Sequence, residues 1–448
     1  MSLCNEIEKI LDIDRNMDLY HRVIYFDEED ISIYFFTSII DEGQLNSLIR
    51  FMSLDNGRIR VKDKSVKIST SDNINEIVNR VLDGNVLFVT SRFNYLIDLK
   101  KYALRGIQEP NIEKTIRGSR DGFNESIINN ISLIRMRIKS PKLRIESLLV
   151  GKETKTQVAL IYLESEVDSD NLFWLRTKIF SLNLDSLIMT DRALEENIFK
   201  QIKTIYPIVR YTERPDVASI HIINGKFVLI VDGSPSSIIT PVSLFDHLKH
   251  VEEFRLNPLV GVFTKILRFV ASLLSLFLIP TIYLMQTNNF QINIFSYYVE
   301  NDAFFPLSIQ YIFCSLIVEV FRIAIIHTPN TLVTALSIVI GIIFGELSIS
   351  TGLFIPEVLL IVALSTTCSF SIPSYELSMS NKLLMIFFLF IASIFGLEGY
   401  LIVVLICFIK ISSIKVLGVP FLSPLIPFRR KEFFDILIRT DASMKKKV

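Results

Sequence analysis

The stretch at residues 383–409 reads LLMIFFLFIASIFGLEGYLIVVLICFI and contains one charged residue, Glu398. A transmembrane helix needs about 20 mostly apolar residues, so this stretch is long enough to enter a membrane. The sequence Gly396-Leu397-Glu398-Gly399 interrupts it, which leaves two interpretations: one long helix with a break, or two short arms that re-enter. Re-entrant backbone is tolerated only where protein or water satisfies its polar groups. The stretch therefore predicts an integral membrane protein.

Charged residues are distributed very unevenly around this stretch. Of the 94 Asp, Glu, Lys and Arg residues in the chain, residues 1–258 hold 71 and residues 259–428 hold 13. Such a fall indicates a change of surroundings, from water to lipid. The formal net charge is zero, so the overall charge does not favour a nucleic-acid partner. We expect a soluble α/β portion at 1–258, an α-helical polytopic membrane domain at 259–428 and a basic tail at 429–448.

Four further apolar segments precede the stretch, at about 269–285, 306–326, 332–347 and 358–370. Lys265 and Arg268 lie at the edge of the first, as the positive-inside rule expects for a helix that enters from the cytoplasm. The polar residues 286–305 contain no Lys or Arg, which suits the opposite side.

Both ends of the chain are expected to be cytoplasmic. The N-terminus begins MSLCNEIEK, without the basic and apolar regions of a secretory signal. The tail is rich in Lys and Arg, so it is expected to stay inside. With both ends on one side the number of crossings must be even, and five apolar segments leave four or six crossings open.

Residues 1–258 alternate strand-like and helix-like segments and predict two α/β subdomains, at 1–122 and 123–258. In the first, residue composition and apolar spacing predict strands at 22–26, 31–39, 85–90 and 95–99 and helices at 41–52 and 74–81. In the second, they predict helices at 124–138 and 170–180 and strands at 143–150, 158–163 and 186–189. Residues 219–231 are expected to form a tight hairpin around Gly225.

The segment 108–125, which reads QEPNIEKTIRGSRDGFNE, lies where the two predicted subdomains meet. Its alternating charges and its glycines, which permit positive φ, indicate an exposed or interfacial loop. A solvated linker and a contact surface are both compatible with this pattern.

The sequence shows no catalytic, cofactor-binding or metal-binding constellation. It has no P-loop and no GxGxxG motif, and its five histidines form no ligand cluster. The four cysteines lack metal-ligand spacing and suit buried apolar positions. We therefore expect a protein that is not an enzyme and carries no cofactor.

Charged residues inside the apolar segments are the first candidate functional residues, because charges at membrane depth are costly and usually pair or line a water path. Glu319 and Arg322 are three residues apart and share a helix face. This spacing leaves open a neutralised pair near the interface and a pore or gating role.

Glu346 follows a face of small residues, formed by Ser337, Gly341 and Gly345. Small residues on one face let helix backbones approach closely. The acidic side chain beside this face either lines a cation path or lies in the headgroup region. We hypothesise that Glu346 lines the path, so that Glu346→Gln alters cation release.

The chain resembles the A subunits of the GerA-type spore germination receptors over about residues 91–428. The matching motifs are EP at 109–110, IRG at 116–118, RDGFNES at 120–126, NISLIR at 130–135, YTERPDV at 211–217, EVFR at 319–322, SIVIG at 337–341, IPSYEL at 372–377 and LGVPFLSP at 417–424. So many ordered matches argue against chance. The chain departs from the pattern at Glu346, where family members commonly carry Gln, and at Asn330-Thr331, where they usually carry Gly-Gln.

The resemblance implies a protein of the bacterial spore inner membrane that acts with a transporter-like B subunit and a lipoprotein C subunit. It also implies an oligomeric component that conducts monovalent cations when nutrients bind, chiefly to the B subunit. The stage V sporulation protein AF branch, which shares the architecture and is thought to amplify ion release, is one alternative. A non-conducting scaffold is another, and a secondary transporter fits weakly because the apolar segments show no internal repeat.

Overall fold

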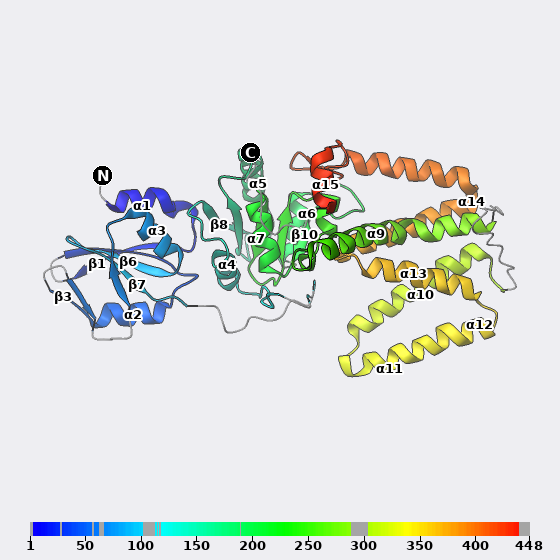
Figure 1. Ribbon diagram of the computed structural model, residues 1–448, viewed down its shortest axis with the longest axis horizontal. Coiled ribbons are helices and arrows are strands. Elements are labelled where there is room, and N and C mark those ends of the chain that lie inside the picture. The colour runs from blue at the N-terminus through cyan, green and yellow to red at the C-terminus, as the bar shows by residue number, and fades with distance from the viewer. Residues whose placement is uncertain are drawn as a thin grey trace. The chain divides into compact units, whose positions relative to one another are not determined.

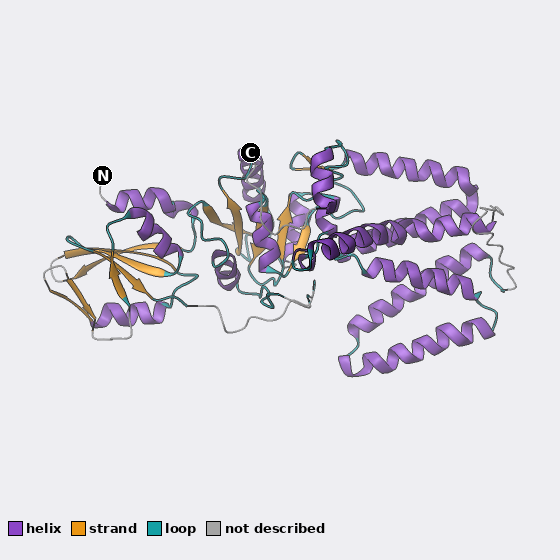
Figure 2. Ribbon diagram, viewed as in Figure 1, coloured by secondary structure: helices purple, strands orange, loops and turns teal. Residues whose placement is uncertain are grey.

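The computed structural model describes residues 3–26, 29–55, 58–61, 67–101, 113, 115, 118–188, 190–287 and 303–438. Contacts between residues divide the chain into two compact units. One unit holds residues 1–203, 209–242 and 416–418, and it contains the two large sheets (Figures 1 and 2). The other holds residues 204–208, 243–415 and 419–448 and is mainly helical. Residues 243–258 thus group with the helical unit.

The first sheet has five antiparallel strands in the order β1-β2-β6-β7-β5. Alternate residues of β2 point to opposite faces, as the two-residue period of a strand requires. Tyr34 and Phe36 pack with α1 and α3, whereas Ile31 and Ile33 pack with α2. The elements are α1 (Leu3–Leu11), η1 (Ile13–Arg15), β1 (Leu19–Phe26), β2 (Glu29–Phe36), α2 (Glu42–Phe51), β3 (Met52–Asp55), β4 (Arg58–Val61), β5 (Ile68–Thr70), α3 (Ile74–Leu82), β6 (Asn85–Val89) and β7 (Asn94–Asp98).

The second sheet also has five antiparallel strands, in the order β10-β12-β11-β9-β8. Its central strand β11 is buried along its whole length, and α4 packs against α7 while α5 packs against α6. The elements are α4 (Ile127–Arg135), β8 (Leu143–Val150), β9 (Thr156–Leu163), α5 (Ser169–Phe180), α6 (Thr190–Ile198), β10 (Arg210–Thr212), α7 (Pro215–Ile223), β11 (Phe227–Val231) and β12 (Ser237–Thr240). The α/β class predicted from the sequence is confirmed.

Two sequence predictions in this part are wrong. Residues 219–223 belong to helix α7 and not to a hairpin strand, because Pro215 starts the helix with a preset φ and Gly225 follows its end with φ +77°. Residues 186–188, the described part of the strand expected at 186–189, form no strand. The backbone just before them is tied to the turn after β8 instead, through Lys152 N–Leu184 O and Glu153 N–Asp185 O hydrogen bonds of 2.9 Å each.

A buried ion pair joins the two α/β parts within this unit. Arg135 at the end of α4 donates to Asp18 just before β1, with Nη2–Oδ1 at 2.7 Å and Nε–Oδ2 at 3.0 Å. Both side chains are almost fully buried, and the guanidinium carbon of Arg135 lies 4.3 Å from the ring centroid of Phe36. Ser38 also donates to Asp18 (2.6 Å), so this carboxylate is well satisfied.

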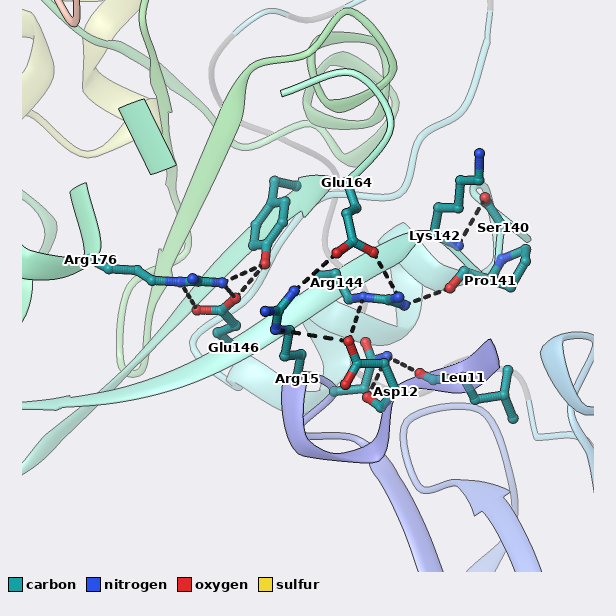
Figure 3. A network of polar contacts seen from close by, with 12 residues as sticks. Leu11, Asp12, Arg15, Ser140, Pro141, Lys142, Arg144, Glu146, Glu164 and Arg176 are labelled. Carbon is teal, nitrogen blue, oxygen red and sulfur yellow. Dashed lines mark hydrogen bonds and ion pairs between the residues drawn. The ribbon is translucent and has the colours of Figure 1, made fainter. Parts of the chain in front are cut away.

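Further charged side chains continue the joint along β8 and β9 (Figure 3). Arg144 of β8 contacts Asp12 at 3.3 Å and Glu164 at 2.7 Å, and Arg15 donates to Glu164 at 2.9 Å. Since Asp12 and Arg15 belong to the first part, these pairs tie η1 to the second sheet.

The segment expected to be an exposed or interfacial loop is partly buried in its described residues. Glu113 forms a buried ion pair with Arg210 and accepts a hydrogen bond from the hydroxyl of Thr212 (2.8 Å). Arg214, which is 1 % exposed, donates to the carbonyl of Ser119 (3.1 Å) and to Asp216 (2.8 Å). These contacts hold the described part of the segment against β10 and α7.

The helical unit contains four helices that are long and apolar enough to cross a membrane, at 258–287, 307–325, 332–350 and 375–413, within the residues that the structure describes. The shorter apolar helix α13 lies between the last two. The polar residues expected at 286–305 fall mostly at 288–302, outside the described residues. The elements are α8 (Leu244–Leu248), η2 (Val251–Phe254), α9 (Pro258–Thr287), α10 (Leu307–His327), α11 (Asn330–Gly341), the π-helical turn η3 (Ile342–Leu347), α12 (Ser348–Ser350), α13 (Pro356–Phe370), α14 (Tyr375–Ser413), β13 (Lys415–Val416), β14 (Val419–Pro420) and α15 (Arg430–Ile438).

Helix α14 is two helical arms that meet at Gly396. This residue has φ 63° and ψ −152°, a conformation essentially restricted to glycine, so the helix breaks there. Figure 1 shows the second arm running back in the opposite sense. The interruption seen in the sequence at Gly396 is therefore a turn between two arms. The first arm packs with α9 and α13 in the core of the unit, around Ile279, Val358 and Phe388.

Candidate functional site

Three charged side chains gather between α10 and α14, two of the apolar helices. The Arg322 Nη2 atom lies 2.5 Å from Glu319 Oε1, one helical turn away on α10. Lys382 of α14 places its Nζ atom 3.5 Å from Glu319 Oε2. The side chains are only 14 %, 15 % and 8 % exposed for Arg322, Glu319 and Lys382. We call these three residues the α10–α14 charge cluster.

Local sequence explains how α14 brings Lys382 into this cluster. Pro373 disfavours a helical residue before it, and Ser374 then caps the new helix by accepting the backbone N–H of Leu377 (3.4 Å). Lys382 therefore lies two turns inside α14. The first residue of the helix, Tyr375, places its ring centroid 4.8 Å from the guanidinium carbon of Arg322.

The charges of the cluster decide what it can do. One carboxylate faces two cations, so the formal charge of the cluster is positive. A positive group repels cations, and the cluster by itself is a poor wall for a cation path. Its geometry instead links α10 to α14, because the only carboxylate of the cluster contacts a cation from each helix.

A neutral polar seam lies beside the cluster and joins α14 to α9. Asn381 donates from Nδ2 to the hydroxyl of Ser275 at 3.0 Å and to the carbonyl of Ser272 at 3.2 Å. The hydroxyl of Tyr206 donates to Asn381 Oδ1 at 3.4 Å. Asn381 is nearly fully buried, so its satisfied amide fixes the position of α14 on α9.

The structure places the other predicted residues elsewhere. Glu346 lies in the π-helical turn η3 and is exposed, and among the described residues no ion pair joins it to Arg322, which pairs with Glu319. π-helical turns inside α-helices frequently mark functional sites. The residues predicted from the sequence therefore form two groups. Glu319 and Arg322 are paired on α10, whereas the second group lies largely exposed on α11 and η3 and consists of Ser337, Gly341, Gly345 and Glu346.

The small-residue face of α11 and η3 is open as far as the described residues show. A Cβ atom added at Gly341 or Gly345 would meet nothing within 4 Å, and Ser337 is exposed with its hydroxyl bonded to the carbonyl of Val333 (2.8 Å). Close packing on this face stays a prediction, and it applies to a neighbour outside the chain.

Lys382 and Asn381 are the functional candidates that sequence reasoning missed. Both directly precede the apolar run at 383–409, so composition alone put them outside the membrane segment. The signal that could have found them is the helix start at Tyr375, which follows Pro373 and the capping Ser374.

Fold and site together define a polytopic membrane protein with a two-part α/β domain and a charge cluster between apolar helices. The model of the Bacillus/Clostridium GerA spore germination protein family matches residues 5–448, and the chain belongs to this family.

Individual proteins show the same relationship. The chain is 36 % identical to stage V sporulation protein AF of Bacillus subtilis (strain 168), over 92 % of this chain and 87 % of that protein. It is 27 % identical to spore germination protein KA of the same organism, over 97 % of this chain and 84 % of that protein. The crystal structure of the N-terminal domain of the A subunit of the Bacillus megaterium spore germinant receptor GerK3 aligns with a TM-score of 0.40 and 22 % identity, covering 53 % of this chain and 92 % of that one.

Proposed function

We propose that the chain is an A-subunit-type component of a spore germination receptor that conducts or gates the release of monovalent cations, as an oligomer. The observation that carries the proposal is the position of Glu346. It is the single charged residue in residues 330–350, and it lies beside an open face of small residues.

A ring of identical chains explains why such a face is useful. Gly341 and Gly345 let neighbouring helices approach closely, and each copy then brings one Glu346 carboxylate toward a shared axis. Rings of acidic side chains select cations in channels. The α10–α14 charge cluster has a different role in this proposal: it holds α10 and α14 in register, so that a change in one helix is passed to the other.

The family supports a proposal for the location and the partners of the chain. We place the chain in the spore inner membrane, with a transporter-like B subunit and a lipoprotein C subunit as partners. The basic residues Lys265 and Arg268 at the start of α9 support a cytoplasmic position for residues 1–258.

A second candidate function is favoured by the comparison with stage V sporulation protein AF. Identity to that protein is 36 %, against 27 % to spore germination protein KA, over similar shares of this chain. In this second proposal the chain amplifies ion release and does not take part in sensing nutrients. Neighbouring genes distinguish the two: B and C receptor genes favour the first, and a stage V operon favours the second.

Ion flux tests the proposal. The purified full-length protein, checked for oligomeric state, is placed in liposomes alone and with its B and C partners, and K⁺ and Na⁺ release is followed. We expect protein-dependent flux that falls several-fold, or loses its preference for cations, in Glu346→Gln. The matched control is Glu357→Gln, which removes a carboxylate from the first turn of α13. Flux that is unchanged in Glu346→Gln removes Glu346 from the path, and no flux in any combination favours the scaffold.

A further inference from the structure

A basic hollow lies where the first apolar helix begins. It is lined by Phe245 of α8 and by Lys249, which directly follows α8. Glu253 of η2 also lines it, together with Lys265 and Phe269 of α9. Ile436 of α15 closes one side. The enclosed part measures about 20 Å³, which is room for one water molecule, so a larger ligand lies at its mouth.

Cations outnumber carboxylates around this hollow. Lys249, Lys265 and Arg268 face two acids: Asp246, whose Oδ1 lies 3.0 Å from Lys249 Nζ, and Glu253, which is paired with Arg268. Burial raises the pKa of Glu253 against the pull of Arg268, Lys265 and Lys249. Glu252 and Arg255 on the same stretch have opposite charges, and the described side chains before and at the start of α15 add three cations and one carboxylate: Arg429, Arg430, Lys431 and Glu432.

An apolar stripe runs away from the hollow along α9. Ile266, Val270 and Leu273 recur at helical spacing toward the apolar part of α9 and are 45 %, 42 % and 44 % exposed. On the other side of the hollow α15 packs on α8 through Phe433, whose ring lies 5.9 Å from that of Phe245. The hollow therefore combines a positive mouth with an adjoining surface suited to acyl chains.

We propose that this hollow binds the phosphate of an anionic phospholipid, with the acyl chains lying along the exposed stripe of α9. Basic side chains at the cytoplasmic end of a membrane helix attract anionic headgroups. The apolar stripe favours a lipid over a soluble phosphate, because only a lipid has acyl chains that contact it. The inference does not depend on ion conduction.

Lipid binding by the purified full-length protein tests the proposal. Dioleoyl phosphatidylglycerol, dioleoyl phosphatidylcholine and glycerol phosphate are titrated separately in non-ionic detergent, and bound lipid is counted by native mass spectrometry alongside the thermal midpoint. We expect phosphatidylglycerol to bind in preference and to raise the midpoint. The variant Lys249→Gln/Lys265→Gln should bind it about fivefold more weakly for each lysine removed.

Two control variants keep the test sharp. Lys410→Gln removes an exposed cation from the second arm of α14 and should leave binding unchanged. Lys249→Arg/Lys265→Arg keeps both charges and should keep the preference, which separates loss of charge from loss of fold. Equal binding of the two lipids, equal loss in Lys410→Gln, or an equal effect of glycerol phosphate would each overturn the proposal.

Discussion

At the scale of single residues, the Arg135–Asp18 pair shows how strongly one buried charge depends on another. Arg135 is 1 % exposed and its guanidinium makes two hydrogen bonds to Asp18. Removing one partner of a buried pair leaves an uncompensated charge, which costs about 3–5 kcal/mol. Loss of either partner is therefore expected to destabilise this joint more than loss of a partner from the partly exposed pairs around it.

We expect Asp18→Ala to lower the free energy of unfolding of the α/β unit by about 3–5 kcal/mol. Trp174, the single tryptophan in the sequence, lies in α5 of the same unit and reports unfolding in urea by its fluorescence. The control Asp14→Ala removes an exposed carboxylate from η1 and should cost less than about 0.5 kcal/mol. Similar shifts for both variants would contradict a special role for the buried pair.

The α10–α14 charge cluster makes a second prediction at this scale, because its three charges depend on one another. Glu319→Gln leaves the cations Arg322 and Lys382 close together in an apolar bundle, whereas Lys382→Met leaves a neutral pair. We expect Glu319→Gln to lower the thermal midpoint more than Lys382→Met does.

The double variant Glu319→Gln/Lys382→Met should be more stable than Glu319→Gln alone, since it removes one of the two unpaired cations. Thermal unfolding of the four proteins in one detergent measures this. If the two effects simply add, the three side chains are not coupled.

At the scale of elements, α2 shows how a cap makes helix stability depend on pH. Asp41 accepts the backbone N–H groups of Gly43 (3.0 Å) and Gln44 (3.2 Å). The hydrogen bond from Gln44, helped by Lys101, holds the pKa of Asp41 below its usual value despite partial burial. A lowered folded-state pKa stabilises the fold above the unfolded-state pKa of about 3.9, and this contribution disappears as pH falls through the folded-state pKa.

We expect Asp41→Ala to destabilise the unit by about 1 kcal/mol at pH 7 and to approach wild-type stability in acid. Asp41→Asn should cost little at either pH, because an amide oxygen also caps a helix. Thermal unfolding across a pH series compares the three proteins. A constant gap between wild type and Asp41→Ala down to pH 2 would show that the carboxylate charge does not matter.

Much of the element layout was predictable from the sequence because local pattern and packing agree there. The apolar residues Leu45 and Leu48 recur at helical spacing, and α2 buries them as expected. In α7, composition and packing disagree: Ile220, Ile222 and Ile223 favour a strand, but the helix that starts at Pro215 covers the sheet. Lys382 was missed for a similar reason. It precedes the apolar run but lies inside α14, because the helix already starts at Tyr375.

At the scale of the whole molecule, the path of the chain through the helical unit bears on the number of crossings. The residues that the structure describes give six helical passes: α9, α10, α11 to α12, α13 and the two arms of α14. Of these, α13 is short for a membrane helix. Six is even, as the expected cytoplasmic position of both ends requires, and four crossings result if α13 and one arm do not span. The turn at Gly396 is therefore the place to test the topology.

Cysteine labelling separates these topologies. In a protein whose cysteines at 4, 314, 368 and 407 are replaced, single cysteines are introduced at Glu398 and Lys415, and vesicles of known orientation are treated with a membrane-impermeant maleimide. We expect cysteine 398 to react from the non-cytoplasmic side and cysteine 415 to react from the side of a reference cysteine at Asp14. If α14 crossed once as a single helix, position 398 would be shielded by lipid and positions 415 and 14 would label from opposite sides. Since both arms are apolar and Gly396 reverses the chain between them, we expect the two-arm outcome.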